Sequence, residues 1–111
     1  MKPPSPAPAY VMLYECLSDV ARAHGYALAI HGSLQRDLDL VAIPWTEEAG
    51  DPDELVEALR QRGQHWMFEG PGGERPPIYD ATPKPHGRMA YTLPIMGDRF
   101  VDVSVMPRTL S

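Results

Sequence analysis

The feature that most constrains this chain is a short apolar run, residues 37–43, that carries two aspartates two positions apart. In a β-strand, successive side chains point to opposite faces, so Asp37 and Asp39 would share one face. The apolar residues of the run would point the other way, toward a core: Leu38, Leu40 and Ala42. Two carboxylates that close repel each other unless one is protonated or a cation lies between them. The run therefore predicts a strand with a carboxylate pair suited to Mg²⁺ or Mn²⁺, which favour oxygen ligands.

The composition is that of one small globular domain. The chain has 111 residues, of which 43% are hydrophobic and 23% are charged, and this is ordinary for a soluble protein with one core. The net charge of −5 argues against general nucleic-acid binding, which requires a basic surface. The single cysteine, Cys16, excludes an intrachain disulfide. With no signal-peptide pattern and no apolar run of membrane-spanning length, we expect a cytoplasmic protein that does not enter a membrane.

The first half of the chain predicts a helix, two strands and a second helix. Apolar residues at helical spacing indicate a helix over residues 9–24, and Gly25 stands where a left-handed residue would end it. A short strand over residues 26–30 then leads through a turn into the aspartate-bearing strand. The segment 51–54, Asp-Pro-Asp-Glu, is a strong helix start with its first residue as N-cap, and this helix would end before Gly63.

The middle of the chain is irregular. Residues 64–69 are ambiguous, and we interpret them as a short strand. Residues 70–87 hold five prolines and four glycines, which predicts a long loop. Long loops in small domains are usually either functional or mobile. We expect this loop to form one wall of a binding cleft, with a surface excursion as the alternative.

The last part of the chain predicts a hairpin. Alternating apolar residues indicate strands over residues 88–95 and 100–106, joined by a turn at residues 96–99. In the last strand, Asp102 and Ser104 would lie on the face opposite to the valines. The whole order predicts an α+β fold, a small mixed β-sheet with helices packed on one face.

The predicted domain lies between two short tails. Residues 1–8 contain four prolines and predict a flexible tail, or alternatively a proline-rich ligand for a partner. Residues 9–107 would form the single domain, and residues 108–111 a second short tail.

Three carboxylates are the candidate catalytic and metal-binding residues. Asp37, Asp39 and Asp102 would lie on one face of the sheet if their strands are neighbours. Three carboxylates so placed could hold two metal ions, which clamp the attacking and leaving oxygens of a phosphoryl transfer. The alternative is that all three are solvent-facing strand residues, although aspartate is depleted in strands.

Other residues are candidates for substrate binding. The turn at Gly32-Ser33 offers backbone N–H groups and a hydroxyl that could bind phosphate, and Arg36 beside it could contact phosphate or pair with the carboxylates. His86 and Arg88, at the end of the long loop, could face phosphate or a partner. His31 and His65 could join a metal site, but each could equally be a structural histidine.

This arrangement resembles the nucleotidyltransferase fold, the superfamily of DNA polymerase beta-like enzymes and minimal nucleotidyltransferases. That family carries a Gly-Ser turn, then Asp-x-Asp on the next strand, then a third carboxylate on a neighbouring strand. Here Gly32-Ser33 matches the turn, Asp37-Leu38-Asp39 matches the Asp-x-Asp strand, and Asp102 matches the third carboxylate. The resemblance covers residues 9–106. The stretch around the turn also resembles uncharacterised phage and prophage proteins of this size.

The resemblance implies a chemistry. A nucleoside monophosphate would pass from a nucleoside triphosphate to a hydroxyl of an unidentified acceptor, with Mg²⁺ held by the three aspartates. The connection from Ser33 to Asp37 is shorter than the family usually has, which shrinks the phosphate-binding turn. Two alternatives stay open at this point: a catalytically inactive binding module of the same fold that docks to a protein partner, and a metal-dependent phosphodiesterase.

Overall fold

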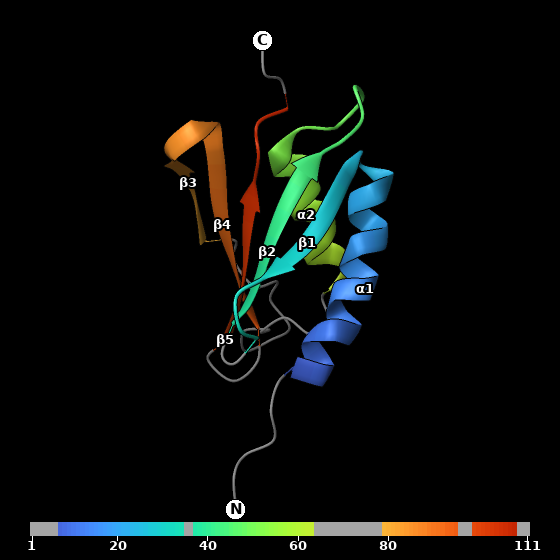
Figure 1. Ribbon diagram of the computed structural model, residues 1–111, viewed down its shortest axis with the longest axis vertical. Coiled ribbons are helices and arrows are strands. Elements are labelled where there is room, and N and C mark those ends of the chain that lie inside the picture. The colour runs from blue at the N-terminus through green and yellow to red at the C-terminus, as the bar shows by residue number, and fades with distance from the viewer. Residues whose placement is uncertain (1–6, 35–36, 64–78, 96–98, 109–111) are drawn as a thin grey trace, which may run out of the picture.

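We describe the protein from a computed structural model, which defines residues 7–34, 37–63, 79–95 and 99–108. These residues form two helices, five strands and a short 3-10 turn (Figure 1). Their bounds are α1 Ala7–Ala23, β1 Tyr26–His31, β2 Leu38–Pro44, α2 Pro52–Arg62, β3 Tyr79–Lys84, the 3-10 turn Pro85–Gly87, β4 Arg88–Ile95 and β5 Arg99–Val105. Neither helix in these ranges is long and apolar enough to cross a membrane.

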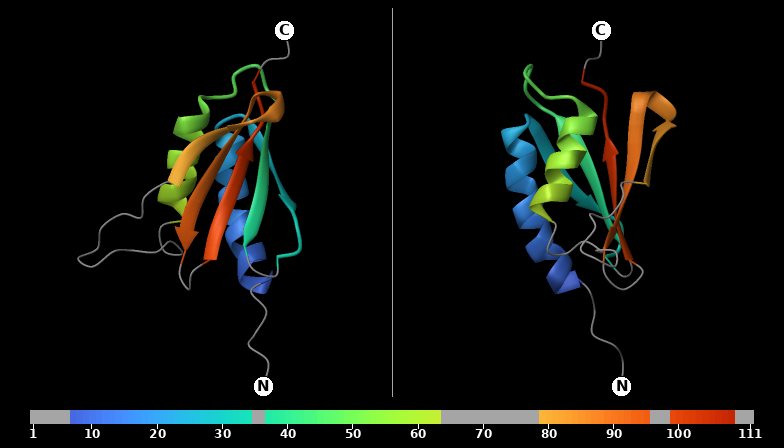
Figure 2. Two further views of the ribbon diagram at one scale, coloured as in Figure 1. Left: turned by 90° about the vertical axis from the view of Figure 1, so that its left-hand side faces the viewer. Right: turned by 180° about the vertical axis from the view of Figure 1, so that it is seen from behind.

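The five strands form one mixed sheet in the order β1-β2-β5-β4-β3. The pairs β1–β2, β3–β4 and β4–β5 are antiparallel, whereas β2 and β5 are parallel neighbours at the centre. Both helices lie behind the sheet when its other face is turned to the viewer (Figure 2, left). The predicted α+β class, with a small mixed sheet and helices on one face, is therefore confirmed.

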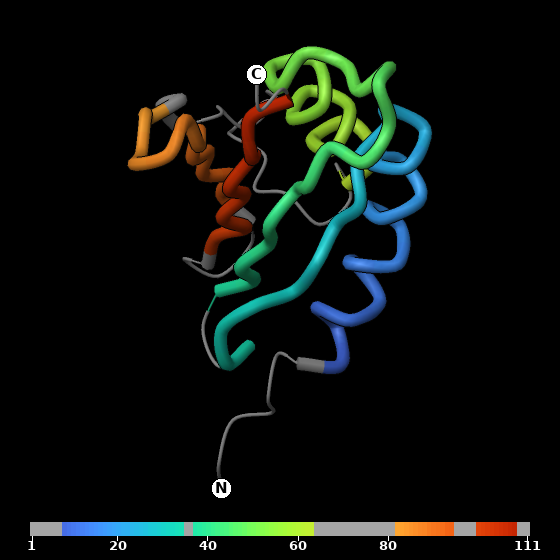
Figure 3. The backbone as a smooth tube through the Cα atoms, turned by 45° about the horizontal axis from the view of Figure 1, so that its top comes forward, coloured from blue at the N-terminus to red at the C-terminus, as the bar shows by residue number. Residues whose placement is uncertain are grey.

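The core lies between the sheet and the two helices. The alternation predicted for β2 is found, because Leu38, Leu40 and Ala42 are fully buried. From β5 the three valines Val101, Val103 and Val105 point into the same core, and leucines of both helices cover them. Helix α1 runs alongside β1 (Figure 3). This burial fixes which side chains of β2 and β5 remain on the opposite face.

The helix signals in the sequence operate as predicted. Asp51 is the N-cap of α2, and its side chain accepts a hydrogen bond from the backbone N–H of Asp53 at 2.8 Å. Pro52 occupies the first turn, where its missing N–H is not needed. Gly25 ends α1 with φ of +84°, a conformation that favours glycine.

The predicted long loop over residues 70–87 is corrected in its last part. Residues 79–84 form strand β3, and residues 85–87 form the 3-10 turn. Pro83 is the reason why the sequence does not predict a strand here, because proline is disfavoured in central strands. It is tolerated here because β3 is an edge strand, whose outer side needs no ladder hydrogen bond.

Smaller differences concern the ends of elements. The predicted tail 1–8 is shortened, since Ala7 and Pro8 already belong to α1, and proline is compatible with a first helical turn. Residues 1–6, the predicted strand 64–69, the rest of the predicted loop up to residue 78, the turn at 96–98 and the last residues, 109–111, lie outside the described part of the chain.

Candidate functional site

The face of the sheet that no helix covers carries the candidate site, and we call it the uncovered face. On it, Asp39 of β2 lies directly beside Asp102 of β5, because these residues are partners in the parallel ladder. Their row continues to His31 on one side and Thr92 on the other. The structure thus brings together two predicted carboxylates that are far apart in the sequence.

The two carboxylates affect each other electrostatically. Burial raises the pKa of Asp102, and the charges of Asp39 and Asp37 together with hydrogen bonding to Asp39 raise it further. The hydroxyl of Thr92 donates to Asp102 Oδ1 at 3.1 Å and acts in the opposite direction, lowering this pKa. The net effect is a raised pKa for Asp102, as expected for a half-buried carboxyl beside like charges.

Asp37 lies just before β2 and is held by β5. Its Oδ1 accepts a hydrogen bond from the backbone N–H of Phe100 at 3.2 Å. This contact ties the start of β2 to the start of β5 and keeps the Asp37 charge close enough to act on Asp102. Asp37 thus belongs to the same carboxylate group, with one oxygen already engaged by the backbone.

The Gly-Ser turn packs directly against this group. Gly32 has φ of +80°, and a Cβ at this position would lie 2.6 Å from Asp39 Oδ2. Leu34, two residues later, also has a positive φ, of 60°. Strained backbone in a non-glycine residue tends to occur at binding and catalytic sites. The absent side chain of Gly32 leaves room for the Asp39 carboxylate.

The donor chemistry of the group suits Mg²⁺, but its present geometry is that of a pair rather than a closed ligand set. Among the described residues, no three acidic, histidine or cysteine side chains are arranged to hold one metal ion. Asp39 and Asp102 supply adjacent carboxylate oxygens, which Mg²⁺ prefers, and this cation usually keeps several waters beside one or two carboxylates. The metal site therefore stays a prediction with a compatible donor pair.

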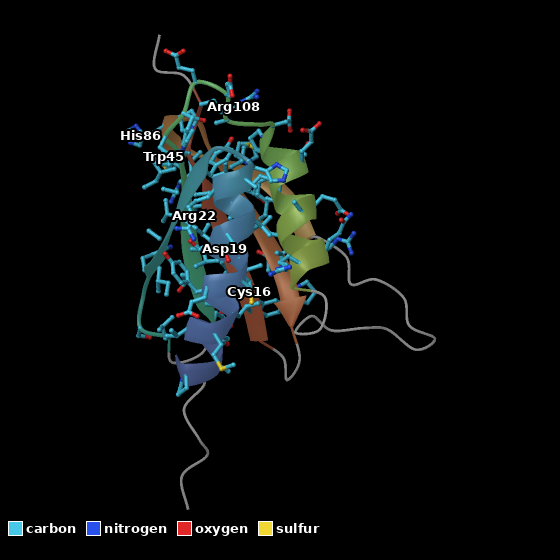
Figure 4. All side chains as sticks on the ribbon, turned by 90° about the vertical axis from the view of Figure 1, so that its right-hand side faces the viewer. Cys16, Asp19, Arg22, Trp45, His86 and Arg108 are labelled. Atoms are coloured by element: carbon cyan, nitrogen blue, oxygen red, sulfur yellow. The ribbon has the colours of Figure 1, made fainter. Side chains whose placement is uncertain are left out.

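The remaining predicted site residues do not join the carboxylate pair. Arg36 lies outside the described part of the chain. Arg88 begins β4, four residues before Thr92, and His86 lies in the turn that precedes it, with φ of +69°. Neither contacts the carboxylates. In Figure 4, His86 lies at one end of the molecule with Trp45 and Arg108.

On the uncovered face, the described residues line two hollows that bear on function. The first, of about 370 Å³, begins at Asp102 and spreads over β4 and β3; we call it the β4 hollow. Its lining residues are Thr82, Lys84, Ala90, Tyr91, Thr92, Asp102, Val103 and Ser104. The second, of about 510 Å³, is mainly apolar and lies toward His86; we call it the apolar hollow. It is lined by Val41, Ile43, Pro44, His86, Met106, Pro107 and Arg108.

Three polar residues of the β4 hollow were not identified from the sequence: Thr82, Lys84 and Thr92. The alternation of β4 could have placed Thr92 on the face opposite to Tyr91, but only the strand pairing brings it to Asp102. The sequence matches no protein-family model and no curated protein.

Proposed function

We propose that this chain is a minimal cytoplasmic nucleotidyltransferase that moves a nucleoside monophosphate from a nucleoside triphosphate to a hydroxyl. One observation carries the proposal: Asp39 and Asp102 are direct neighbours across the parallel strands, and Gly32 packs on the Asp39 carboxylate. A purely structural surface gains nothing from two adjacent carboxylates, because their repulsion is a cost. A bound cation that carries a phosphate would remove this repulsion, so its binding would be favoured.

The proposed roles follow from position. Asp39 and Asp102 would hold Mg²⁺, with the Asp37 carboxylate beside them, and the Gly32-Ser33 turn would face the triphosphate with its backbone N–H groups. Mg²⁺, when bound, supplies charge neutralisation for the triphosphate and for the carboxylates. The roles of the aspartates match those expected from the resemblance to the nucleotidyltransferase fold.

The proposed reaction is an in-line displacement at the α-phosphorus. The acceptor hydroxyl oxygen forms a bond to this phosphorus, the bond from the α-phosphorus to the bridging oxygen breaks, and pyrophosphate leaves with the bonding electrons. Asp102 accepts the hydroxyl proton, because burial raises the pKa of this carboxyl above its usual value. The products are the nucleotidylated acceptor and pyrophosphate.

Nucleotide binding tests the proposal. Unfolding of the full chain is followed with each of the four common nucleoside triphosphates, with Mg²⁺ or Mn²⁺. A ligand at a hundredfold excess over its Kd adds about 2.7 kcal/mol to the free energy of unfolding. Asp39→Asn should remove this gain. Asp19→Asn is the matched control, since Asp19 is exposed on α1 and paired with Arg22. If none of the nucleotides stabilises the chain in the presence of metal, the proposal is contradicted.

A second candidate function is a binding module of the same fold that docks to a protein partner. The apolar hollow favours it, since Ile43 and Trp45 are 45% and 67% exposed at this end of the molecule. The same titration separates the two candidates, because a docking module needs neither nucleotide nor metal. Release of pyrophosphate in the presence of an acceptor distinguishes nucleotidyl transfer from a phosphodiesterase.

A further inference from the structure

The β4 hollow owes its shape to one small residue. Ala90 lies at its centre, between Ser104 of β5 and Thr82 of β3 in the sheet register. A methyl group at this position leaves a depression that a larger side chain would fill. The volume of about 370 Å³ lies within the range of small-molecule sites.

The lining of this hollow is polar, with a negative charge at one end and a positive charge at the other. Asp102 and Thr92 lie at one end, and Lys84 lies at the other. Lys84 is the direct partner of Arg88 in the β3–β4 ladder, so the two cations share the uncovered face. Among the described residues, neither forms an ion pair with a carboxylate.

Two adjacent cations repel each other, and this cost needs a compensating anion. The chain has an overall charge of −5, so the cation pair is a local exception to its acidic surface. A phosphate group is the anion that best suits an arginine and a lysine together, because it carries up to two charges and accepts several hydrogen bonds.

The position of the hollow relative to the carboxylates decides its role. In the strand order β1-β2-β5-β4-β3, the Gly32 turn lies on the β1–β2 side of the carboxylate pair and the hollow lies on the β4–β3 side. Figure 2 (left) shows these strands side by side on the uncovered face. An in-line displacement places the attacking oxygen and the leaving group on opposite sides of the phosphorus. If the triphosphate binds at the turn, the acceptor belongs in the hollow.

We propose that the β4 hollow is the acceptor site, and that the acceptor is a small phosphorylated hydroxyl compound. Its phosphate is bound by Lys84 and Arg88, and its reacting hydroxyl faces Asp102. Along β4, Ala90 lies about 7 Å and Arg88 about 13 Å from Thr92, at about 3.3 Å per residue. This span suits a sugar phosphate or a nucleotide rather than a polymer. The inference rests on the proposed nucleotidyl transfer and names its acceptor class.

Binding of a matched probe pair to the full chain tests the proposal. Ribose 5-phosphate and ribose differ only in the phosphate, and NMR titration follows the backbone amides of Ala90, Thr92 and Ser104. The shifts of these amides should give a Kd for ribose 5-phosphate that is at least tenfold lower than the Kd for ribose. The double variant Lys84→Ala/Arg88→Ala should lose this preference, and the control Arg62→Ala, an exposed cation on α2, should keep it.

Ala90→Leu provides a second, independent variant. Leucine should fill the hollow and weaken ribose 5-phosphate binding at least tenfold while nucleotide binding with Mg²⁺ is retained, since the Gly32 turn is untouched. Equal binding of the two probes, or unchanged binding in Ala90→Leu with an intact fold, overturns the acceptor site and leaves the proposed function standing. If no nucleotide binds while ribose 5-phosphate does, the proposed function fails, and with it the role of the hollow as an acceptor site.

Discussion

Replacing Gly32 by alanine separates backbone strain from carboxylate positioning. The positive φ of Gly32 costs an alanine about 1–2 kcal/mol, partly offset by about 0.4–1 kcal/mol of lost freedom in the unfolded chain. The new Cβ would also lie 2.6 Å from Asp39 Oδ2, the end of a flexible side chain that can rotate away. We therefore expect a modest loss of about 1 kcal/mol, which lowers Tm by about 4–8 °C in a domain of this size, together with a displaced carboxylate.

Gly87→Ala is the matched control for this variant. Gly87 has φ of +77°, and a Cβ there would lie 3.4 Å from Pro107, close to ordinary contact. Both variants should lose similar stability in thermal unfolding followed by circular dichroism. Only Gly32→Ala should change the NMR titration of the Asp102 carboxyl, which is sensitive to the Asp39 charge. Identical Asp102 titrations in the two variants would refute the idea that Gly32 positions the carboxylate.

Four further predictions concern two carboxylates, a helix cap and a buried hydroxyl. Asp39→Asn should leave the unfolding free energy without metal unchanged or raise it, because a like charge beside Asp102 is removed; a loss above about 2 kcal/mol would indicate a structural hydrogen bond instead. The native pKa of Asp102 is raised above the ordinary value of about 3.8, so the free energy of unfolding should fall as the pH rises from 3.8 through the native pKa. Asp102→Asn should flatten this dependence of the unfolding free energy on pH, measured by urea unfolding. Asp51→Ala should cost about 1 kcal/mol through loss of the α2 N-cap, measured by the same unfolding, and no loss would exclude the cap. Tyr91→Phe should cost about 1.5–3 kcal/mol, since the buried hydroxyl donates to Asp53 at 2.7 Å; a neutral result would show that water replaces it.

Much of the fold could be predicted because its signals are local. The alternation around Asp39 predicted which face of β2 is buried, and the segment beginning at Asp51 predicted the start of α2. The pairing of Asp39 with Asp102 could be expected only from the resemblance, because no local pattern states that β2 and β5 are neighbours. Whether these residues bind metal or nucleotide stays a prediction.

The β4 hollow could not be predicted for a different reason. Its shape depends on the register that places Thr82 beside Ala90 and Lys84 beside Arg88. That register requires β3, which the prolines of the segment concealed. A single small residue such as Ala90 carries no signal by itself, since its effect depends on what the neighbouring strands place around it.

The parallel pairing of β2 with β5 determines when the carboxylates meet during folding. Asp37 and Phe100, which join the two strands, are 63 residues apart in the sequence. The hairpins β1–β2 and β4–β5 close short loops, whereas the central pair closes a long one at a larger entropic cost. The repulsion between Asp39 and Asp102 is therefore incurred only when the two halves of the sheet join. A chain that has formed both hairpins without joining them has no carboxylate pair, so capture of a cation by the pair can stabilise only the fully assembled sheet.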